Sequence, residues 1–137
     1  MTDFLQTVKE RVVVYDGAMG TNIQFRNPGV DDFWGKEGCN ELLVLSRPDI
    51  IKDIHASFFK VGCDVVETNT FGSTRVVLAE YDLQDKTAEL NIAAARLANE
   101  VAQHTRAGLV WLSGSAAAPG SAGMGRRVLQ RPTGRRR

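Results

Sequence analysis

Cysteine is scarce in this chain, and so are long apolar stretches. The 137 residues include only Cys39 and Cys63, which form no C-x-x-C motif and are too few for a disulfide framework. No apolar run approaches the roughly 18 residues of a membrane-spanning helix. The first residues also lack the basic and apolar blocks of a signal peptide. We therefore expect a cytoplasmic protein with no membrane partner, in which both cysteines are structural rather than metal ligands.

Acidic residues are absent after Glu100. Residues 1–105 carry a net charge of −6, whereas residues 106–137 carry +7 and consist mainly of arginine, glycine, alanine, serine and proline. A segment of this composition buries too little apolar surface to fold, so we expect a disordered basic tail. Its abrupt onset is also typical of a shifted reading frame in a GC-rich gene. The tail could attract nucleic acid electrostatically, but it has no binding motif, and we do not expect nucleic acid as a partner.

A stretch in the middle of the chain has the pattern of an amphipathic helix. Ser46 is a typical N-cap residue, Pro48 is tolerated in a first turn, and Gly62 is typical of the position just past a helix end. The apolar stripe of this helix would consist of Ile51, Ile54, Phe58 and Val61. Apolar, β-branched runs flank the helix at residues 11–15 and 63–67, and both are predicted to be buried parallel strands.

Other segments of the first 105 residues are also predicted to be helical. A short helix is expected at residues 5–10, and another from Gly72 to about Tyr81. A longer helix, with Asp85 as its N-cap, is expected to continue to about residue 104. Its apolar stripe would consist of Leu90, Ala94, Leu97 and Val101.

The remaining segments complete a prediction of the fold class. Residues 22–40 are interpreted as irregular, with Phe33 and Trp34 anchoring them to the body, and residues 109–112 as a third strand. Strand, helix and strand with short connections form a βαβ unit. The predicted fold class is therefore α/β, with a parallel sheet.

Polar side chains follow both of the first two predicted strands. Asp16 follows the first strand, and Glu67 ends the second, with Thr68, Asn69 and Thr70 directly behind it. Because the carboxyl ends of neighbouring parallel strands lie at the same edge of a sheet, we expect these side chains to lie close together. Two carboxylates suit an ammonium group, and the backbone N–H groups of the glycine-containing loop after Asp16 suit a carboxylate. An amino acid carries both groups.

Each of these features also has a plainer interpretation. A carboxylate at a strand end is often the N-cap of the next helix, and this interpretation stands beside the first for either acid taken alone. Asp-Gly pairs are common in ordinary turns. His55 lies within a helix beside its apolar stripe and is interpreted as structural. His104, near a helix end, would satisfy terminal carbonyl groups.

Two motifs in this sequence closely resemble the homocysteine S-methyltransferase family. They are residues 16–21 (DGAMGT) and residues 67–72 (ETNTFG). The segments at residues 39–43, 47–51, 78–81 and 89–91 fit the same family. The likeness covers roughly residues 10–105 and is strongest to the homocysteine-binding domain of the cobalamin-dependent branch.

The resemblance implies a (β/α)8 TIM barrel that transfers a methyl group to the sulfur of homocysteine. In the family a zinc ion holds that sulfur as a thiolate. In the cobalamin-dependent branch the methyl donor is methylcobalamin, which other domains recharge from methyltetrahydrofolate. By match to the motifs, Asp16 and Glu67 would belong to the homocysteine pocket. The floor of that pocket would be shaped by Gly17, Asn69, Thr70 and Phe71.

The sequence departs from the family pattern in two ways. The zinc cysteines of the family come later, one alone and two adjacent after Gly-Gly, and nothing here matches them, so we assign no catalytic or metal-ligating residue. A barrel needs about 200 residues or more, whereas the matching region offers two to three of eight βα units. Residues 1–105 are therefore predicted to be the N-terminal part of a homocysteine-binding domain, a partial barrel, and residues 106–137 its disordered or frameshifted tail.

Three hypotheses follow for the function. The first is a fragment of a homocysteine S-methyltransferase that is inactive alone because it lacks the zinc cysteines. The second is a small amino-acid-binding or interaction module whose basic tail binds nucleic acid. The third is one half of a split enzyme, completed by a complementary C-terminal polypeptide.

Overall fold

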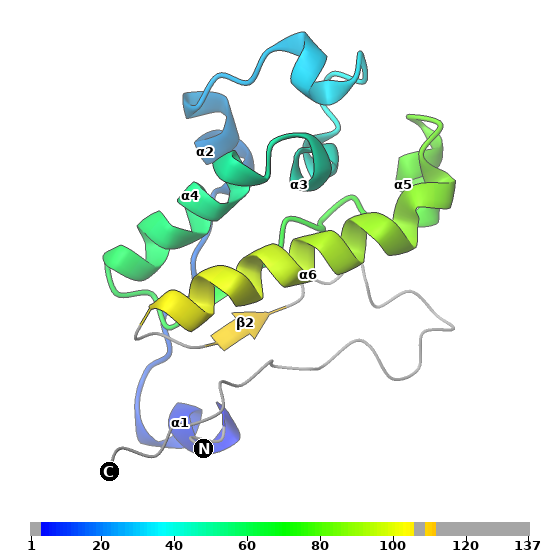
Figure 1. The fold of residues 1–137 in the computed structure, drawn as a ribbon. Helices are drawn as coiled ribbons and strands as arrows, with labels where there is room; N and C mark the ends of the chain where they lie inside the picture. The colour runs from blue at the N-terminus through cyan, green and yellow to red at the C-terminus, as the bar shows by residue number, and fades with distance from the viewer. Residues whose placement is uncertain (1–3, 106–108, 112–137) are drawn as a thin grey trace.

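The computed structural model describes residues 4–105 and 109–111. Its helices are, in chain order, α1 (Phe4–Glu10), α2 (Met19–Phe25), α3 (Leu43–Ser46), α4 (Pro48–Lys60), α5 (Arg75–Ala79) and α6 (Thr87–His104). Its short 3-10 turns are η1 (Val30–Phe33), η2 (Asn40–Leu42) and η3 (Gln84–Lys86), and its strands are β1 (Val65–Glu67) and β2 (Leu109–Trp111). Helix α1 lies apart from the other helices, whereas α4 and α6 run side by side (Figure 1). Among these residues, no helix is both long and apolar enough to cross a membrane.

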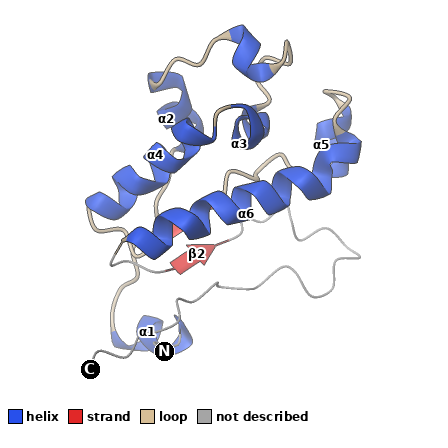
Figure 2. Cartoon of the chain, in the orientation of Figure 1, coloured by secondary structure: helices blue, strands red, loops and turns tan. Residues whose placement is uncertain are grey.

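The sheet is short and parallel, and helix α6 lies over one side of it (Figure 2). Strand β1 pairs in parallel with β2, so that Val66 lies opposite Val110. On its other side, β1 receives a single parallel bridge between Tyr15 and Val65. The third strand, predicted at residues 109–112, is confirmed at Leu109–Trp111, whereas only the Tyr15 bridge is present from the predicted first strand of the βαβ unit. The rest of the predicted tail, residues 106–108 and 112–137, lies outside the described residues.

The first predicted strand, residues 11–15, does not form as a buried strand. The side chains of Val12 and Val14 are 82% and 49% exposed. The carboxylate of Asp64 accepts the Val14 N–H at 3.0 Å and pairs with the Arg11 guanidinium at 2.7 and 2.8 Å. A side chain thus takes the place of the backbone acceptor that a continuous ladder would need there. The segment consequently joins the sheet only at its last residue.

Helix α4 forms where the sequence predicts a helix, but it begins differently. Ser46 does not cap it, because Ser46 ends α3 and its hydroxyl donates to the Leu42 carbonyl at 3.3 Å. The N-cap position belongs to Arg47, whose side chain makes no capping bond. At the other end, Gly62 has the left-handed φ of 98° expected past a helix end. Val61 lies beyond the last turn and is 80% exposed, so it does not belong to the predicted stripe.

Helix α6 carries the predicted apolar stripe on its buried side. Leu90 and Ala94 are fully buried, Val101 is 9% exposed, and Leu97 packs partly buried against the same core. Asp85 does not cap this helix, because it lies within the preceding turn η3 and α6 begins without a side-chain cap.

Residues 22–40 contain more helix than the sequence predicts. They include most of α2 and the turn η1. A seven-residue helix offers too few turns for an apolar period to be recognised, which explains the difference. Phe33 is 7% exposed and anchors the segment as predicted, whereas Trp34 is 48% exposed and does not.

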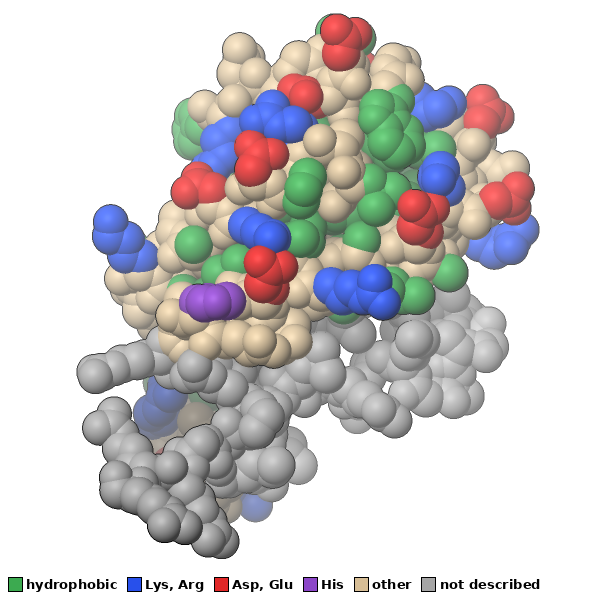
Figure 3. All heavy atoms as spheres, viewed as in Figure 1, with side chains coloured by type: hydrophobic (Ala, Val, Ile, Leu, Met, Phe, Trp, Pro, Cys, Tyr) green, Lys and Arg blue, Asp and Glu red, His purple; other side chains and the backbone are tan. Residues whose placement is uncertain are grey.

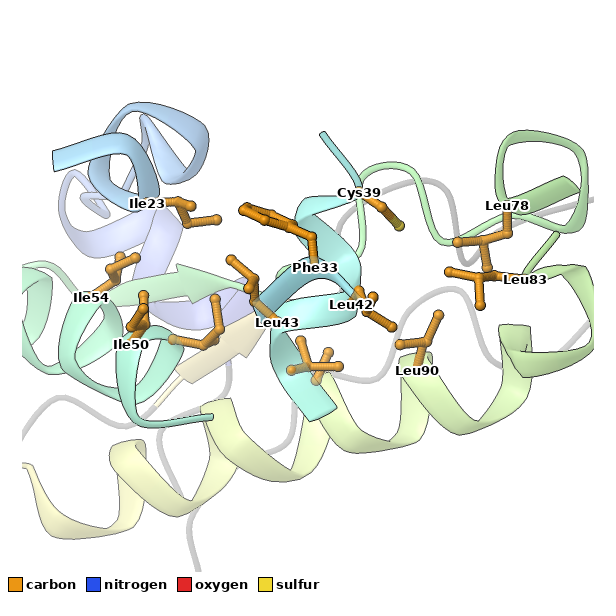
Figure 4. Packing of buried hydrophobic residues seen from close by; sticks show 13 residues of the cluster. Ile23, Phe33, Cys39, Leu42, Leu43, Ile50, Ile54, Leu78, Leu83 and Leu90 are labelled. Atoms are coloured by element: carbon orange, nitrogen blue, oxygen red, sulfur yellow. The ribbon is translucent and has the colours of Figure 1, made fainter. Parts of the chain in front are cut away.

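The main core lies between α2, α3, α4 and α6 (Figure 4). Its labelled members are Ile23, Phe33, Cys39, Leu42, Leu43, Ile50, Ile54, Leu78, Leu83 and Leu90. A second, smaller cluster forms where β1 packs against α4 and α6. It consists of Phe59, Val66, Ala98, Val101 and Ala102. Each fully buried Leu or Ile stabilises the fold by about 1.5–3 kcal/mol relative to exposure. The loop that follows β1 therefore starts at a strand that is packed against α4 and α6.

Candidate functional site

A pocket of about 330 Å³ opens at the carboxyl end of β1. Three segments that are distant in sequence meet there. Its lining residues are Asp16, Gly17, Ala18, Met19, Gly20, Asn40, Glu41, Glu67, Thr68, Asn69 and Phe71. Both predicted carboxylates thus face one pocket, together with Gly17, Asn69 and Phe71 from the predicted set.

Asp16 is fixed against the end of β1 by two hydrogen bonds. Its N–H donates to the Val65 carbonyl at 3.0 Å, and its Oδ1 accepts the Glu67 N–H at 2.9 Å. Burial, the largest influence, raises the pKa of Asp16 to about 6, and the nearby Glu67 carboxylate adds to the rise although the Glu67 N–H opposes it. Asp16 is therefore a carboxylate whose negative charge is costly without a cation in the pocket.

The turn after Asp16 gains its shape from an alanine as well as from glycine. Ala18 adopts the left-handed conformation, with φ 52° and ψ 37°, and α2 begins directly after it. That conformation costs a non-glycine residue about 1 kcal/mol or more. Gly20 lies within α2, so only Gly17 and Ala18 form the loop proper. The sequence indicated a glycine loop here but not that an alanine would carry the positive φ.

The loop after β1 divides its residues between the pocket and the interior. Asn69 is 5% exposed, and its Nδ2 donates to the Asn40 carbonyl at 2.8 Å. Phe71 is 87% exposed at the pocket rim. Thr70, which the resemblance places in the pocket floor, does not line the pocket. Its side chain is fully buried, with its hydroxyl 2.8 Å from that of Thr68.

Sequence reasoning gave several lining residues no role in the pocket, among them Asn40 and Glu41. The Glu41 carboxylate accepts the Gly72 N–H at 2.6 Å, across 31 positions of sequence. Residues 39–43 contributed to the family resemblance, but nothing in their spacing assigned them a role. The sequence does contain one signal for Glu41, which directly precedes the apolar pair Leu42 and Leu43. Both leucines are fully buried, and a charged side chain next to buried residues usually has a partner.

The described residues do not fit the zinc ion that the family resemblance implies. Within residues 4–105 there is no group of three or more His, Cys, Asp or Glu side chains placed to hold a metal ion. Cys39 and Cys63 are buried free thiols outside the pocket lining. Burial raises the pKa of both thiols, which disfavours the thiolate that binds zinc.

The two histidines lie away from the pocket. His55 is fully buried in α4, and burial lowers its pKa to about 4. His104 places Nδ1 2.7 Å from the Glu100 carbonyl in the last turn of α6, as predicted for a residue that satisfies a terminal carbonyl.

The surface over α4 and α6 carries acidic and basic side chains that are interspersed (Figure 3). One pair on these two helices, Lys52 and Glu100, forms an ion pair at 2.7 Å.

Comparison with known proteins supports the family resemblance in the sequence. The chain matches the family described as homocysteine S-methyltransferase over residues 13–132. It is 48% identical over 104 residues to the methionine synthase of Mycobacterium leprae and 46% identical over 101 residues to that of Mycobacterium tuberculosis. These matches cover 73% and 74% of this chain. They cover 9% and 8% of the two relatives, so the chain spans less than a tenth of their length.

Solved structures of the homocysteine methyltransferase MmuM from Escherichia coli resemble the fold. The metallated form matches with a TM-score of 0.62 and 19% identity, over 84% of this chain and 43% of that one. The oxidized form matches with a TM-score of 0.61 and 22% identity, over 83% and 42%. At these identities the likeness shows the fold alone. Because the family match covers most of the sequence, the chain belongs to the homocysteine S-methyltransferase family.

Proposed function

We propose that the pocket at the end of β1 binds the amino-acid end of homocysteine. The chain would thereby supply part of the substrate-binding domain of a methyltransferase of the methionine synthase type. The observation that carries the proposal is the meeting of Asp16 and Glu67 in one pocket, where the Glu67 N–H donates to Asp16 Oδ1 at 2.9 Å.

An ammonium group suits this pair of carboxylates for an electrostatic reason. Burial, reinforced by the charge of Glu67, raises the pKa of Asp16 to about 6. A positive charge in the pocket offsets both penalties and favours the ionised carboxylate. Homocysteine carries an ammonium group beside its carboxylate, with the thiol at the end of a short apolar chain. Met19 and Phe71 give the pocket apolar surface for that chain.

The larger architecture is also part of the proposal. We propose that residues 1–105 form the first βα units of a (β/α)8 barrel in the cytoplasm, with residues 106–137 as a separate tail. In a longer enzyme, methylcobalamin would be the methyl donor, and other domains would recharge it from methyltetrahydrofolate. Since the described residues do not fit zinc, we expect the chain alone to bind homocysteine without forming methionine.

Calorimetric titration of the full chain under reducing conditions tests the binding proposal. L-homocysteine should bind saturably, and 4-mercaptobutanoate, which lacks only the amino group, should bind at least tenfold more weakly because it leaves the two carboxylates unpaired. Equal affinities for the two ligands would refute the role of Asp16 and Glu67. Methionine formation that appears only on mixing with a second polypeptide would identify the complementary half expected for a split enzyme.

A further inference from the structure

We propose that Glu41 is a positioning residue, whose carboxylate holds the loop after β1 in the conformation that lines the pocket. The inference deepens the proposed function, because ligand affinity is one of its readouts. It also has a readout that needs no ligand, so the two proposals can fail separately.

Two neighbouring residues of η2 hold two residues of the loop. Glu41 Oε1 accepts the Gly72 N–H at 2.6 Å, and the Asn40 carbonyl accepts from Asn69 Nδ2 at 2.8 Å. A hydrogen bond with an ionised acceptor is about twice as strong as a neutral one. The turn that supplies both acceptors is itself anchored, because Leu42 is fully buried in the main core (Figure 4).

Gly72 fits this contact because it has no side chain. A Cβ at position 72 would lie 2.8 Å from Glu41 Oε1, closer than real Cβ atoms approach, and 3.1 Å from Glu41 Cδ, which is a tight contact. The backbone of Gly72 is not in the left-handed region, so an alanine there would meet no conformational strain. Alanine at position 72 would therefore act by displacing the Glu41 carboxylate.

The two hydrogen bonds to η2 lie on either side of Phe71 in the sequence. Phe71 is 87% exposed, so packing does not fix its position at the pocket rim. Asn69 and Gly72, on either side of it, are the residues bonded to η2. Without the Glu41 bond, the rim would keep only the Asn69 bond to η2, and Phe71 would sample orientations that do not line the pocket.

The test is a double-mutant cycle on the full chain, read as the Kd for L-homocysteine. Glu41→Ala and Gly72→Ala should each weaken binding about tenfold, because each breaks the same charge-assisted hydrogen bond. The double variant should be no weaker than either single variant, because the second change has nothing left to break. Glu41→Gln keeps an acceptor oxygen and should bind within about threefold of the wild type. Glu89→Ala, which removes a carboxylate outside the pocket lining, is the matched control and should bind normally.

Amide hydrogen exchange at Gly72 supplies the readout without ligand. Exchange should accelerate about tenfold in Glu41→Ala and stay near the wild-type rate in Glu41→Gln, while the thermal unfolding midpoints of the two variants agree. If the wild type fails to bind homocysteine, the proposed function falls, and the exchange rates alone decide about Glu41. Unchanged exchange in Glu41→Ala would overturn the inference. So would additive effects in the cycle, or a Glu41→Gln variant as weak as Glu41→Ala, which would indicate that the charge touches the ligand directly.

Discussion

The core beneath β1 and the loop that follows it both contain almost fully buried side chains, but the two sets differ in chemistry. The core around α3, α4 and α6 is apolar. Directly after β1, four polar side chains are almost fully buried: Thr68, Asn69, Thr70 and Ser73. Apolar burial is non-directional and stabilises in proportion to area, whereas buried polar groups gain little net free energy and need fixed partners. We infer that the core supplies the stability of this chain and that the loop supplies its specificity.

The largest expected effect is the loss of a core side chain. Ile54 is fully buried in α4, and Ile54→Ala would remove its apolar contacts and leave a cavity. We expect the free energy of unfolding, measured by urea denaturation, to fall by about 2–5 kcal/mol. Val61→Ala, at an 80% exposed position just past the same helix, is the matched control and should be nearly neutral. Similar losses for both variants would contradict the assigned core.

Acid should destabilise the core through His55. Neither of its ring nitrogens has a hydrogen-bond partner among the described residues, and burial lowers its pKa from 6.5 to about 4. Between these values the unfolded state binds more protons, so stability is highest above pH 6.5 and falls as pH drops towards 4. The loss amounts to about 3 kcal/mol at most. His55→Leu should abolish most of this dependence in denaturation measured from pH 7 to pH 4.

Asp16 should act in the opposite direction over part of that range. Its pKa is raised from 3.8 to about 6, so between these values the folded state binds more protons, and its contribution to stability increases as pH falls. Asp16→Asn keeps an oxygen that can accept the Glu67 N–H. We expect this variant to be at least as stable as the wild type at pH 7 but to bind homocysteine about tenfold more weakly. A variant that loses stability and affinity together would break the proposed separation of core and site.

The smallest expected effect concerns the polar residues inside the loop. Thr70 is fully buried, and its hydroxyl lies 2.8 Å from that of Thr68. Thr70→Val keeps the shape but removes this hydrogen bond, and should cost about 1 kcal/mol of unfolding free energy. A loss as large as that of Ile54→Ala would show that the loop, and not only the core, determines stability.

The sequence predicted the features that depend on local pattern. The stripes of α4 and α6 follow from apolar spacing, and the approach of Asp16 to Glu67 follows from the rule that parallel strands end at one edge. The helix starts at Ser46 and Asp85 were wrong because short turns or helices before α4 and α6 include those residues. Local sequence does not show whether a polar residue caps the helix that follows it or belongs to the helix or turn that precedes it.

Other features depend on contacts between distant residues, and the sequence did not show them. Residues 11–15 have a strand composition, but whether such a run is buried depends on neighbours on both sides, and Asp64 interrupts the ladder on one of them. The role of Glu41 depends on the Gly72 N–H, which is distant in sequence and close only in the folded chain. Thr70 looked like a site residue by motif, yet its side chain is fully buried, with its hydroxyl 2.8 Å from that of Thr68.

The most direct test of the account is the pH dependence of homocysteine binding to the full chain. If the Asp16 carboxylate pairs with the ammonium group, affinity for L-homocysteine should reach a plateau near pH 7 and fall as pH drops through about 6, where that carboxylate becomes protonated. The same titration with Asp16→Asn should show weaker binding and no such fall. Binding of the wild type that is unchanged from pH 7.5 to pH 5 would contradict the assignment of this pocket.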